Sequence, residues 1–160
     1  MTAKSTIYER RVKDVMSRDV VSIHCDATVH DALNLIVENR VSALPVVDSR
    51  DHCVGIISTT DLVDLTRDFD DDVHQLEDAE VSSQWLVEKL IHSVGDEAIQ
   101  SVMTEAVATI NAETTLTRAG REMLRNQVHH LPVVDDRNHL IGILSTMDIL
   151  AEFADSAPEP

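Results

Sequence analysis

Aromatic residues are scarce in this sequence: Phe, Trp and Tyr together make up 2% of its 160 residues, whereas 43% are hydrophobic. A core must therefore be built from Val, Ile, Leu, Ala and Met. Small and β-branched side chains of this kind suit strands packed under helices, which favours an α/β or an α+β arrangement. The length is enough for one ordinary domain or for two very small ones.

Long apolar runs are absent as well. No stretch approaches the roughly 18 apolar residues that a membrane-spanning helix needs. No apolar stretch follows the N-terminus, as it would in a secretory signal peptide. We therefore expect a cytoplasmic protein that makes no contact with a membrane.

Positive charge is in short supply. The 13 Lys and Arg residues stand against 29 Asp and Glu residues, which gives a formal net charge of −16. A polyanion such as DNA or RNA would be repelled by this excess of negative charge. We therefore expect no nucleic-acid partner.

The sequence has only two cysteines, Cys25 and Cys53, and neither lies in a CxxC or CxxH pattern. In a cytosolic protein such residues are expected to remain free thiols, so we predict no metal site. The HExxH, Walker and GxGxxG motifs are also missing, and no nucleophile, base and acid are seen together. We expect no catalytic residues, no enzymatic activity and no cofactor.

What the sequence does contain is an internal repeat. A shift of 87 positions places residues 14–63 on residues 101–150 without a gap, and 20 of the 50 aligned pairs are identical. DVMSRDVVSI then meets SVMTEAVATI, and NRVSALPVVDSRDHCVGIISTTDL meets NQVHHLPVVDDRNHLIGILSTMDI. The chain is therefore two copies of one unit of about fifty residues, joined by a connector.

Both copies predict the same order of elements. An extended piece precedes a helix-start signal at Thr28 and Thr115, after which apolar residues recur at helical spacing. Two apolar runs around a polar turn then predict a β-hairpin, with strands over 43–47 and 53–57 in the first copy and over 131–134 and 140–144 in the second. Because these runs are continuous, we expect the strands to be buried on both faces. A second helix follows, and the resulting β-α-β-β-α unit is too small to close a core alone, so we expect two units to bury one core between them.

The VM opening, the LPVVD strand and the G-I-[IL]-S-T-x-D turn, each present twice, resemble the cystathionine-β-synthase (CBS) domain pair. The resemblance covers residues 12–63 and 99–151. It implies an α+β fold in which two pseudo-twofold-related repeats pack sheet to sheet. Residues 64–98 would then form an acidic and helical connector, and residues 1–11 and 152–160 would be flexible termini.

The resemblance also implies a function. In this family the clefts between two repeats can bind AMP, ADP, ATP or S-adenosylmethionine, and the pair either regulates an attached protein or stands alone. It therefore implies a stand-alone, non-catalytic regulatory module that binds an adenosine nucleotide, forms a homodimer and signals to an unidentified protein. The alternative is a structural dimerisation or scaffold protein whose clefts are degenerate.

Candidate ligand residues lie at the turn from the hairpin into the second helix. A helix N-terminus offers unpaired N–H groups and partial positive charge, which suit a phosphate. By resemblance, the serine of this turn would add a hydrogen bond and the aspartate would accept two from ribose hydroxyls. The same Ser-x-x-Asp spacing is also that of a capping box, and both roles can hold at once. The candidates are Ser58, Thr60 and Asp61 in the first copy, and Ser145 and Asp148 in the second.

The copies differ just before the second strand, where Ser42 and Ala43 correspond to His129 and His130. Nucleotide-binding members of the family carry His-Arg here, so the resemblance implies that His129 and His130 contact phosphate. The alternative is that one or both simply cap a strand end at the surface. The resemblance also implies an apolar slot for adenine. Its residues would be Ser22, Ile23, Ala43, Leu44 and Pro45 in the first copy, and Thr109, Ile110, Leu131 and Pro132 in the second.

The connector carries an acidic run over 68–72, which is typical of a solvated segment. Beyond it, apolar residues at helical spacing over 81–94 include the only tryptophan, Trp85. This stripe either packs on the protein itself or contributes to a dimer or partner contact, where Trp is favoured.

Overall fold

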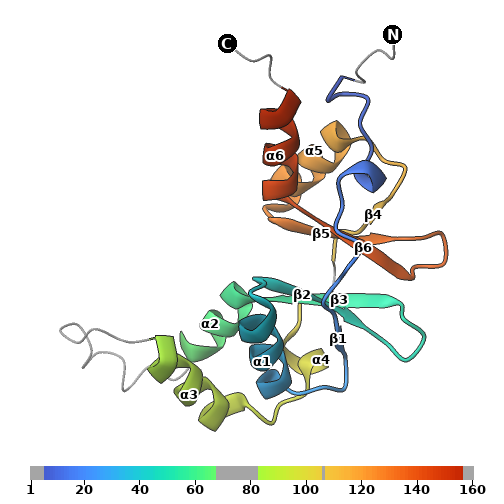
Figure 1. Ribbon diagram of the computed structural model, residues 1–160. Helices are drawn as coiled ribbons and strands as arrows, with labels where there is room; N and C mark the ends of the chain where they lie inside the picture. The colour runs from blue at the N-terminus through green and yellow to red at the C-terminus, as the bar shows by residue number, and fades with distance from the viewer. Residues whose placement is uncertain (1–5, 68–82, 106, 157–160) are drawn as a thin grey trace. The chain divides into compact units, whose positions relative to one another are not determined.

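The computed structural model describes residues 6–67, 83–105 and 107–156. These residues form two compact units, each with its own three-stranded sheet (Figure 1). The repeat-1 unit comprises residues 21–49, 54–67, 83–105 and 107, and the repeat-2 unit comprises residues 6–20, 50–53 and 108–156. The predicted α+β class is confirmed, because each sheet is accompanied by helices of the same unit.

In the repeat-1 unit the chain order is β1 (Ile23–His24), α1 (Val29–Asn39), β2 (Ala43–Val47), β3 (Cys53–Ser58), α2 (Thr59–Arg67), α3 (Ser83–Val94) and α4 (Ile99–Val102). The sheet order is β1-β2-β3, and β1 pairs with β2 in parallel, with Ile23 opposite Val46. The parallel pair is possible because α1 provides the crossover between the two strands.

The repeat-2 unit begins with a short 3-10 helix, η1 (Val12–Asp14), and continues far along the chain with β4 (Ile110–Asn111), α5 (Leu116–Asn126), β5 (His130–Val134), β6 (Leu140–Ser145) and α6 (Thr146–Ser156). Strand β4 pairs with β5 in parallel, and β5 pairs with β6 as an antiparallel hairpin that places His130 opposite Ser145. Helices α5 and α6 lie side by side next to this sheet (Figure 1).

The helix starts follow the predicted signals. The Thr28 hydroxyl accepts the Asp31 N–H at 3.2 Å, and the Asp31 carboxylate accepts the Thr28 N–H at 2.9 Å, so the two form a reciprocal capping box. These bonds hold the pKa of Asp31 below its ordinary value. The Thr115 hydroxyl accepts the Arg118 N–H at the start of α5. Both helices end at a residue in the left-handed region, Arg40 and Gln127, each with φ of 54°.

The strands bury their side chains less uniformly than expected. All five residues of the central strand β2 are buried, and so are the middle three of β5. The prediction of burial on both faces is wrong for β3 and β6, in which several residues are only half-buried. These two strands stand last in the sheet orders β1-β2-β3 and β4-β5-β6, whereas β2 and β5 are central.

Among the described residues, each unit has an apolar core of its own. The core of the repeat-2 unit includes Val12 and Met16 together with Leu131, Val133 and Leu144. The core of the repeat-1 unit includes Ile99, with Met103 packed against it, together with residues of β1, α1, β2 and β3. Each unit therefore takes up the short segment that precedes the other repeat in the sequence.

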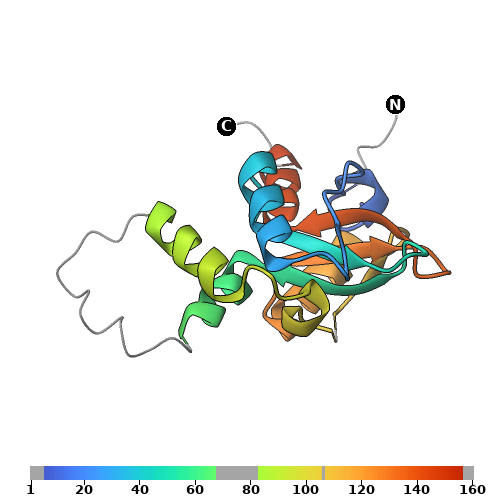
Figure 2. The same cartoon turned by 90° about the horizontal axis from the view of Figure 1, so that it is seen from below.

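Equivalent backbone bonds hold the two exchanged segments. In the repeat-2 unit, Ser17 N–H and Ile143 N–H each donate to the other residue's carbonyl at 3.0 Å. In the repeat-1 unit, Thr104 and Ile56 exchange the same pair of bonds at 3.0 and 3.1 Å. The blue N-terminal segment accordingly lies beside the orange β6 in Figures 1 and 2. Each exchanged segment is thus joined to the last strand of its unit's sheet by a single antiparallel bridge.

Part of the connector is also defined. Helix α3 packs against α1 and α2, and its Leu90 and Val94 are buried in the core of the repeat-1 unit. This agrees with the expectation that the stripe packs on the protein itself. The Trp85 side chain and the acidic run over 68–72 lie outside the described residues. None of the described helices is long and apolar enough to cross a bilayer.

Candidate functional site

At the turn from β3 into α2, one aspartate organises the start of the helix. The Ser58 N–H and hydroxyl donate to Asp61 Oδ2 at 2.8 and 2.9 Å, and the Asp61 N–H donates to Ser58 Oγ at 3.2 Å. The next N–H, from Thr59, donates to the Ser42 carbonyl at 3.0 Å and so joins the helix start to the start of β2. Two of the unpaired N–H groups of this helix end are thereby satisfied.

The turn from β6 into α6 repeats this arrangement. The Ser145 N–H donates to Asp148 Oδ2 at 2.7 Å, and the Asp148 N–H donates to Ser145 Oγ at 3.1 Å. The Thr146 N–H donates to the His129 carbonyl at 2.9 Å. The capping interpretation of both Ser-x-x-Asp turns is therefore confirmed, and these bonds hold both aspartates in place.

The structure separates the two adjacent histidines. His130 is the first residue of β5 and lies opposite Ser145, and burial and the neighbouring His129 hold its pKa below the ordinary value, although Asp148 acts in the other direction. His129 instead lines a hollow of about 450 Å³ between α5 and α6. His130, Ser145 and Asp148 therefore form one group, and His129 belongs to a different surface.

The residues expected to form the adenine slot have two kinds of environment. The side chains of Leu44, Pro45, Leu131 and Pro132 are fully buried, so they serve the cores of their units. Ser22 is half-buried and Thr109 is exposed. At the fully buried positions, backbone groups rather than side chains would have to meet a ligand. Ile23, Ala43 and Ile110 are buried as well, and Thr60 is exposed in the first turn of α2.

The hollow between α5 and α6 was not among the sequence candidates. Its walls are mostly apolar and consist of Gly120, Met123, Leu124, Gln127, Val128, His129, Thr146 and Ile149. Beside it, four large hydrophobic side chains of the same two helices are more than half exposed: Leu124, Met147, Leu150 and Phe153. The signal in the sequence was the presence of apolar residues on both helices beyond those that the core needs.

Comparison with known proteins gives the family. The CBS domain model matches residues 12–68 and 98–155. The chain is 31% identical over 141 residues to inosine-5'-monophosphate dehydrogenase of Methanocaldococcus jannaschii, covering 88% of this chain and 23% of that enzyme. It is 32% identical over 130 residues to the chloroplastic CBS domain-containing protein CBSX1 of Arabidopsis thaliana, covering 77% of this chain and 54% of the plant protein.

A solved structure agrees with these matches. CBSX2 of Arabidopsis thaliana in complex with AMP matches with a TM-score of 0.70 and 28% identity, covering 91% of this chain and 96% of that one. The chain spans about a quarter of the length of the dehydrogenase and about half the length of CBSX1. Two matched repeats, two equivalent α+β units and these relatives lead to one conclusion: the chain belongs to the CBS domain family, as a tandem pair of CBS repeats.

Proposed function

We propose that this CBS pair is a regulatory module that binds an adenosine-type ligand, either AMP, ADP, ATP or S-adenosylmethionine, and reports its presence to another protein. The observation that carries the proposal is the duplicated Ser-x-x-Asp turn, in which each unit fixes one carboxylate at a helix start. A relative that covers nearly the whole chain was solved with AMP, which supports the same ligand class.

The geometry of the turn leaves a defined role for each aspartate. The capping bonds at Asp61 and Asp148 all go to Oδ2. Within the described part of the chain, no hydrogen bond to Oδ1 of either residue is seen. A carboxylate oxygen in this state can accept hydrogen bonds from vicinal ribose hydroxyls. Asp61 and Asp148 are thus the proposed ribose contacts, one in each unit.

The second unit offers an additional phosphate contact. His130 lies beside Ser145 and Asp148, and its pKa is held below the ordinary value chiefly by burial. Near pH 7 it therefore meets a phosphate as a neutral imidazole, which can donate a hydrogen bond but adds no positive charge. Because the first unit has Ala43 at this position, we propose that the two units bind the ligand with different affinity.

The alternative function, a dimerisation scaffold without a ligand, is favoured by a specific observation. Both aspartates already have a structural role as helix caps, and several residues of the expected adenine slot are fully buried. Under this alternative the duplicated turns exist only to start α2 and α6. A homodimer would be needed for this function, and it is also part of the first proposal.

Thermal unfolding with a panel of ligands separates the two functions. We expect AMP, ADP, ATP or S-adenosylmethionine to raise the melting temperature, whereas GMP and UMP leave it unchanged. A ligand at about 100 times its Kd should stabilise the protein by about 2.7 kcal/mol. Identical unfolding curves with every ligand and with buffer would overturn the regulatory proposal in favour of the scaffold.

A further inference from the structure

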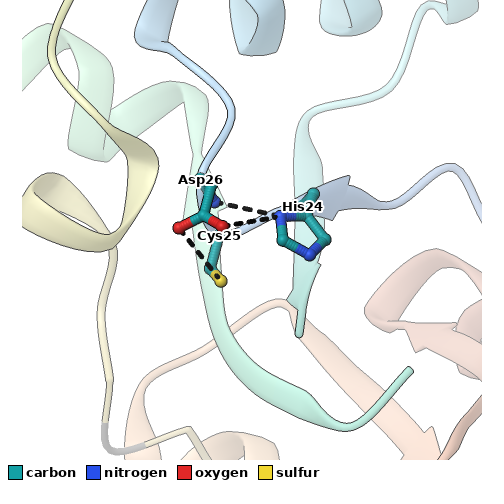
Figure 3. A group of neighbouring side chains, drawn as sticks. All are labelled: His24, Cys25 and Asp26. Atoms are coloured by element: carbon teal, nitrogen blue, oxygen red, sulfur yellow. Dashed lines mark hydrogen bonds and ion pairs between the residues drawn. The ribbon is translucent and has the colours of Figure 1, made fainter. Parts of the chain in front are cut away.

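The turn that follows β1 brings three different metal-binding side chains together. His24, Cys25 and Asp26 are consecutive, and one donor atom of each lies within 4.8 Å of the other two (Figure 3). His24 Nδ1 lies 3.6 Å from Asp26 Oδ2, and Cys25 Sγ lies 3.9 Å from Asp26 Oδ1. The side chains of His24 and Asp26 are 42% and 72% exposed, so an ion can reach them from solvent.

These distances are close to those of a zinc site. With Zn–N and Zn–O bonds of about 2.0 Å, a Zn–S bond of about 2.3 Å and tetrahedral angles, neighbouring donor atoms lie roughly 3.3–3.6 Å apart. The separations of 3.6 and 3.9 Å end on different oxygens of Asp26, and the third donor pair lies within 4.8 Å, so the side chains must rotate to place three donor atoms around one ion. The Asp26 N–H donates to His24 Nδ1 at 3.2 Å, so the single lone pair of this nitrogen is engaged in a hydrogen bond that a bound ion would replace.

The backbone of the turn is held in place on both sides. The Ala27 N–H donates to the His24 carbonyl at 3.0 Å and closes the turn, and the Cys25 N–H donates to the Val47 carbonyl at 2.9 Å. From the other side, the Gln100 N–H donates to the Cys25 carbonyl at 3.1 Å. The three donor atoms are therefore presented by a fixed turn, which lowers the entropic cost of gathering them around an ion.

The second repeat shows that the fold does not require these residue types. The equivalent turn has the same closing bond, from the Thr114 N–H to the Asn111 carbonyl at 3.1 Å, but it consists of Asn111, Ala112 and Glu113. There the carboxylate of Glu113 is paired with Lys13 at 2.7 Å. In the described part of the chain, Asp26 has no Lys or Arg partner. The first turn thus has a histidine and a cysteine at positions where the fold also accepts asparagine and alanine.

We propose that His24 Nδ1, Cys25 Sγ and a carboxylate oxygen of Asp26 bind a zinc-class divalent cation, with a water molecule as the fourth ligand. A thiolate, an imidazole and a carboxylate together favour Zn²⁺ or Co²⁺ over Mg²⁺ and Ca²⁺, which take oxygen ligands. On binding, Cys25 loses its thiol proton to the buffer and forms the metal–sulfur bond. This proposal does not depend on nucleotide binding.

Titration with Co²⁺ tests the site, because a thiolate bound to Co²⁺ gives a near-ultraviolet charge-transfer band. We expect one equivalent of Co²⁺ to produce this band. Added Zn²⁺ should then abolish the band, whereas Mg²⁺ and Ca²⁺ should leave it unchanged. Cys53→Ala is the matched control: this second thiol is buried, and the variant should keep the band.

The test variant is the triple substitution His24→Asn, Cys25→Ala and Asp26→Glu, which places in the first turn the residues that the second turn already carries. Because the equivalent turn folds with these residues, we expect a folded protein without the band. Absence of the band in the unmodified protein, or a band of equal strength in the triple variant, would overturn the proposal.

Discussion

At the residue scale, one aspartate at each strand-to-helix turn has both a structural and a proposed binding role. Asp148 Oδ2 accepts the Ser145 N–H at 2.7 Å, and Asp61 Oδ2 accepts the Ser58 N–H at 2.8 Å. A change that keeps one oxygen acceptor but replaces the other can separate the two roles. Asparagine does this, because its amide has one oxygen and one nitrogen donor.

We predict that Asp148→Asn unfolds at nearly the same denaturant concentration as the unmodified protein but loses much of the stabilisation by AMP. The amide oxygen can still cap α6, whereas the NH₂ group cannot accept a ribose hydroxyl. Ser145→Ala is the contrasting variant, with an expected loss of about 1 kcal/mol in the free energy of unfolding because the cap is removed. Full AMP stabilisation in both Asp148→Asn and Asp61→Asn would show that these aspartates are caps only.

Sequence reasoning at this scale could name side chains but not always their surroundings. The Ser-x-x-Asp spacing predicted the capping boxes correctly because the contact is local, within three residues. The sequence names both His129 and His130 as candidate phosphate contacts, and adjacent residues at a strand start face different surfaces. Only the packing of α5 and α6 shows that His129 lies at their hollow and His130 beside Asp148.

At the element scale, a glycine allows each exchanged segment to lie close to the last strand of the sheet that it joins. The two segments contain Met16 and Ser17, and Met103 and Thr104. A Cβ atom added at Gly142 would lie 2.7 Å from Met16 Sδ and 3.0 Å from the Ser17 carbonyl oxygen. At Gly55 it would lie 2.5 Å from Met103 Sδ and 3.0 Å from the Thr104 carbonyl oxygen. The sulfur atoms can move, but the carbonyls belong to the paired backbone. This explains why both repeats have glycine at this position.

We predict that Gly142→Ala and Gly55→Ala each lower the free energy of unfolding by about 1–3 kcal/mol, the usual cost of overpacking. The control is Gly120→Ala in α5, where an added Cβ meets nothing within 4 Å. That change should stabilise the protein by roughly 0.5–1 kcal/mol because alanine is the better helix former. Urea denaturation measures all three; a neutral effect at both Gly55 and Gly142 would contradict the proposed tight contact.

At the scale of the whole molecule, the two units differ in how their helix pairs are covered. In the repeat-1 unit, α3 packs against α1 and α2. In the repeat-2 unit, Leu124, Met147, Leu150 and Phe153 remain exposed beside the hollow between α5 and α6. An exposed apolar surface of this kind is typical of a protein–protein contact. Because α5 carries Arg121 and Arg125 and α6 carries Asp155, a second copy related by a twofold axis could also pair opposite charges.

We predict a homodimer in which α5 and α6 of one copy contact those of the other, and Leu124→Glu should convert it to the 17.8 kDa monomer. A buried carboxylate without a partner is costly, so the dimer should dissociate. Val37→Glu is the matched control, since Val37 is the aligned residue of the first repeat and is also exposed. Light scattering is the measurement. A monomer before any substitution, or equal loss of the dimer in both variants, would contradict this interface.

The sequence by itself determined that the chain is a duplicated α+β unit. The gapless 87-residue repeat, the helix caps and the hairpin pattern all depend on neighbours within a few residues or on the comparison of one copy with the other. The tertiary structure alone decided which of the two exchanged segments joins which unit. Met16 with Gly142 and Met103 with Gly55 form equivalent contacts, so the local sequence fits either partner, and only the path of the folded chain selects one. The same holds for His24, Cys25 and Asp26, whose donor atoms meet because a hydrogen-bonded turn folds them together.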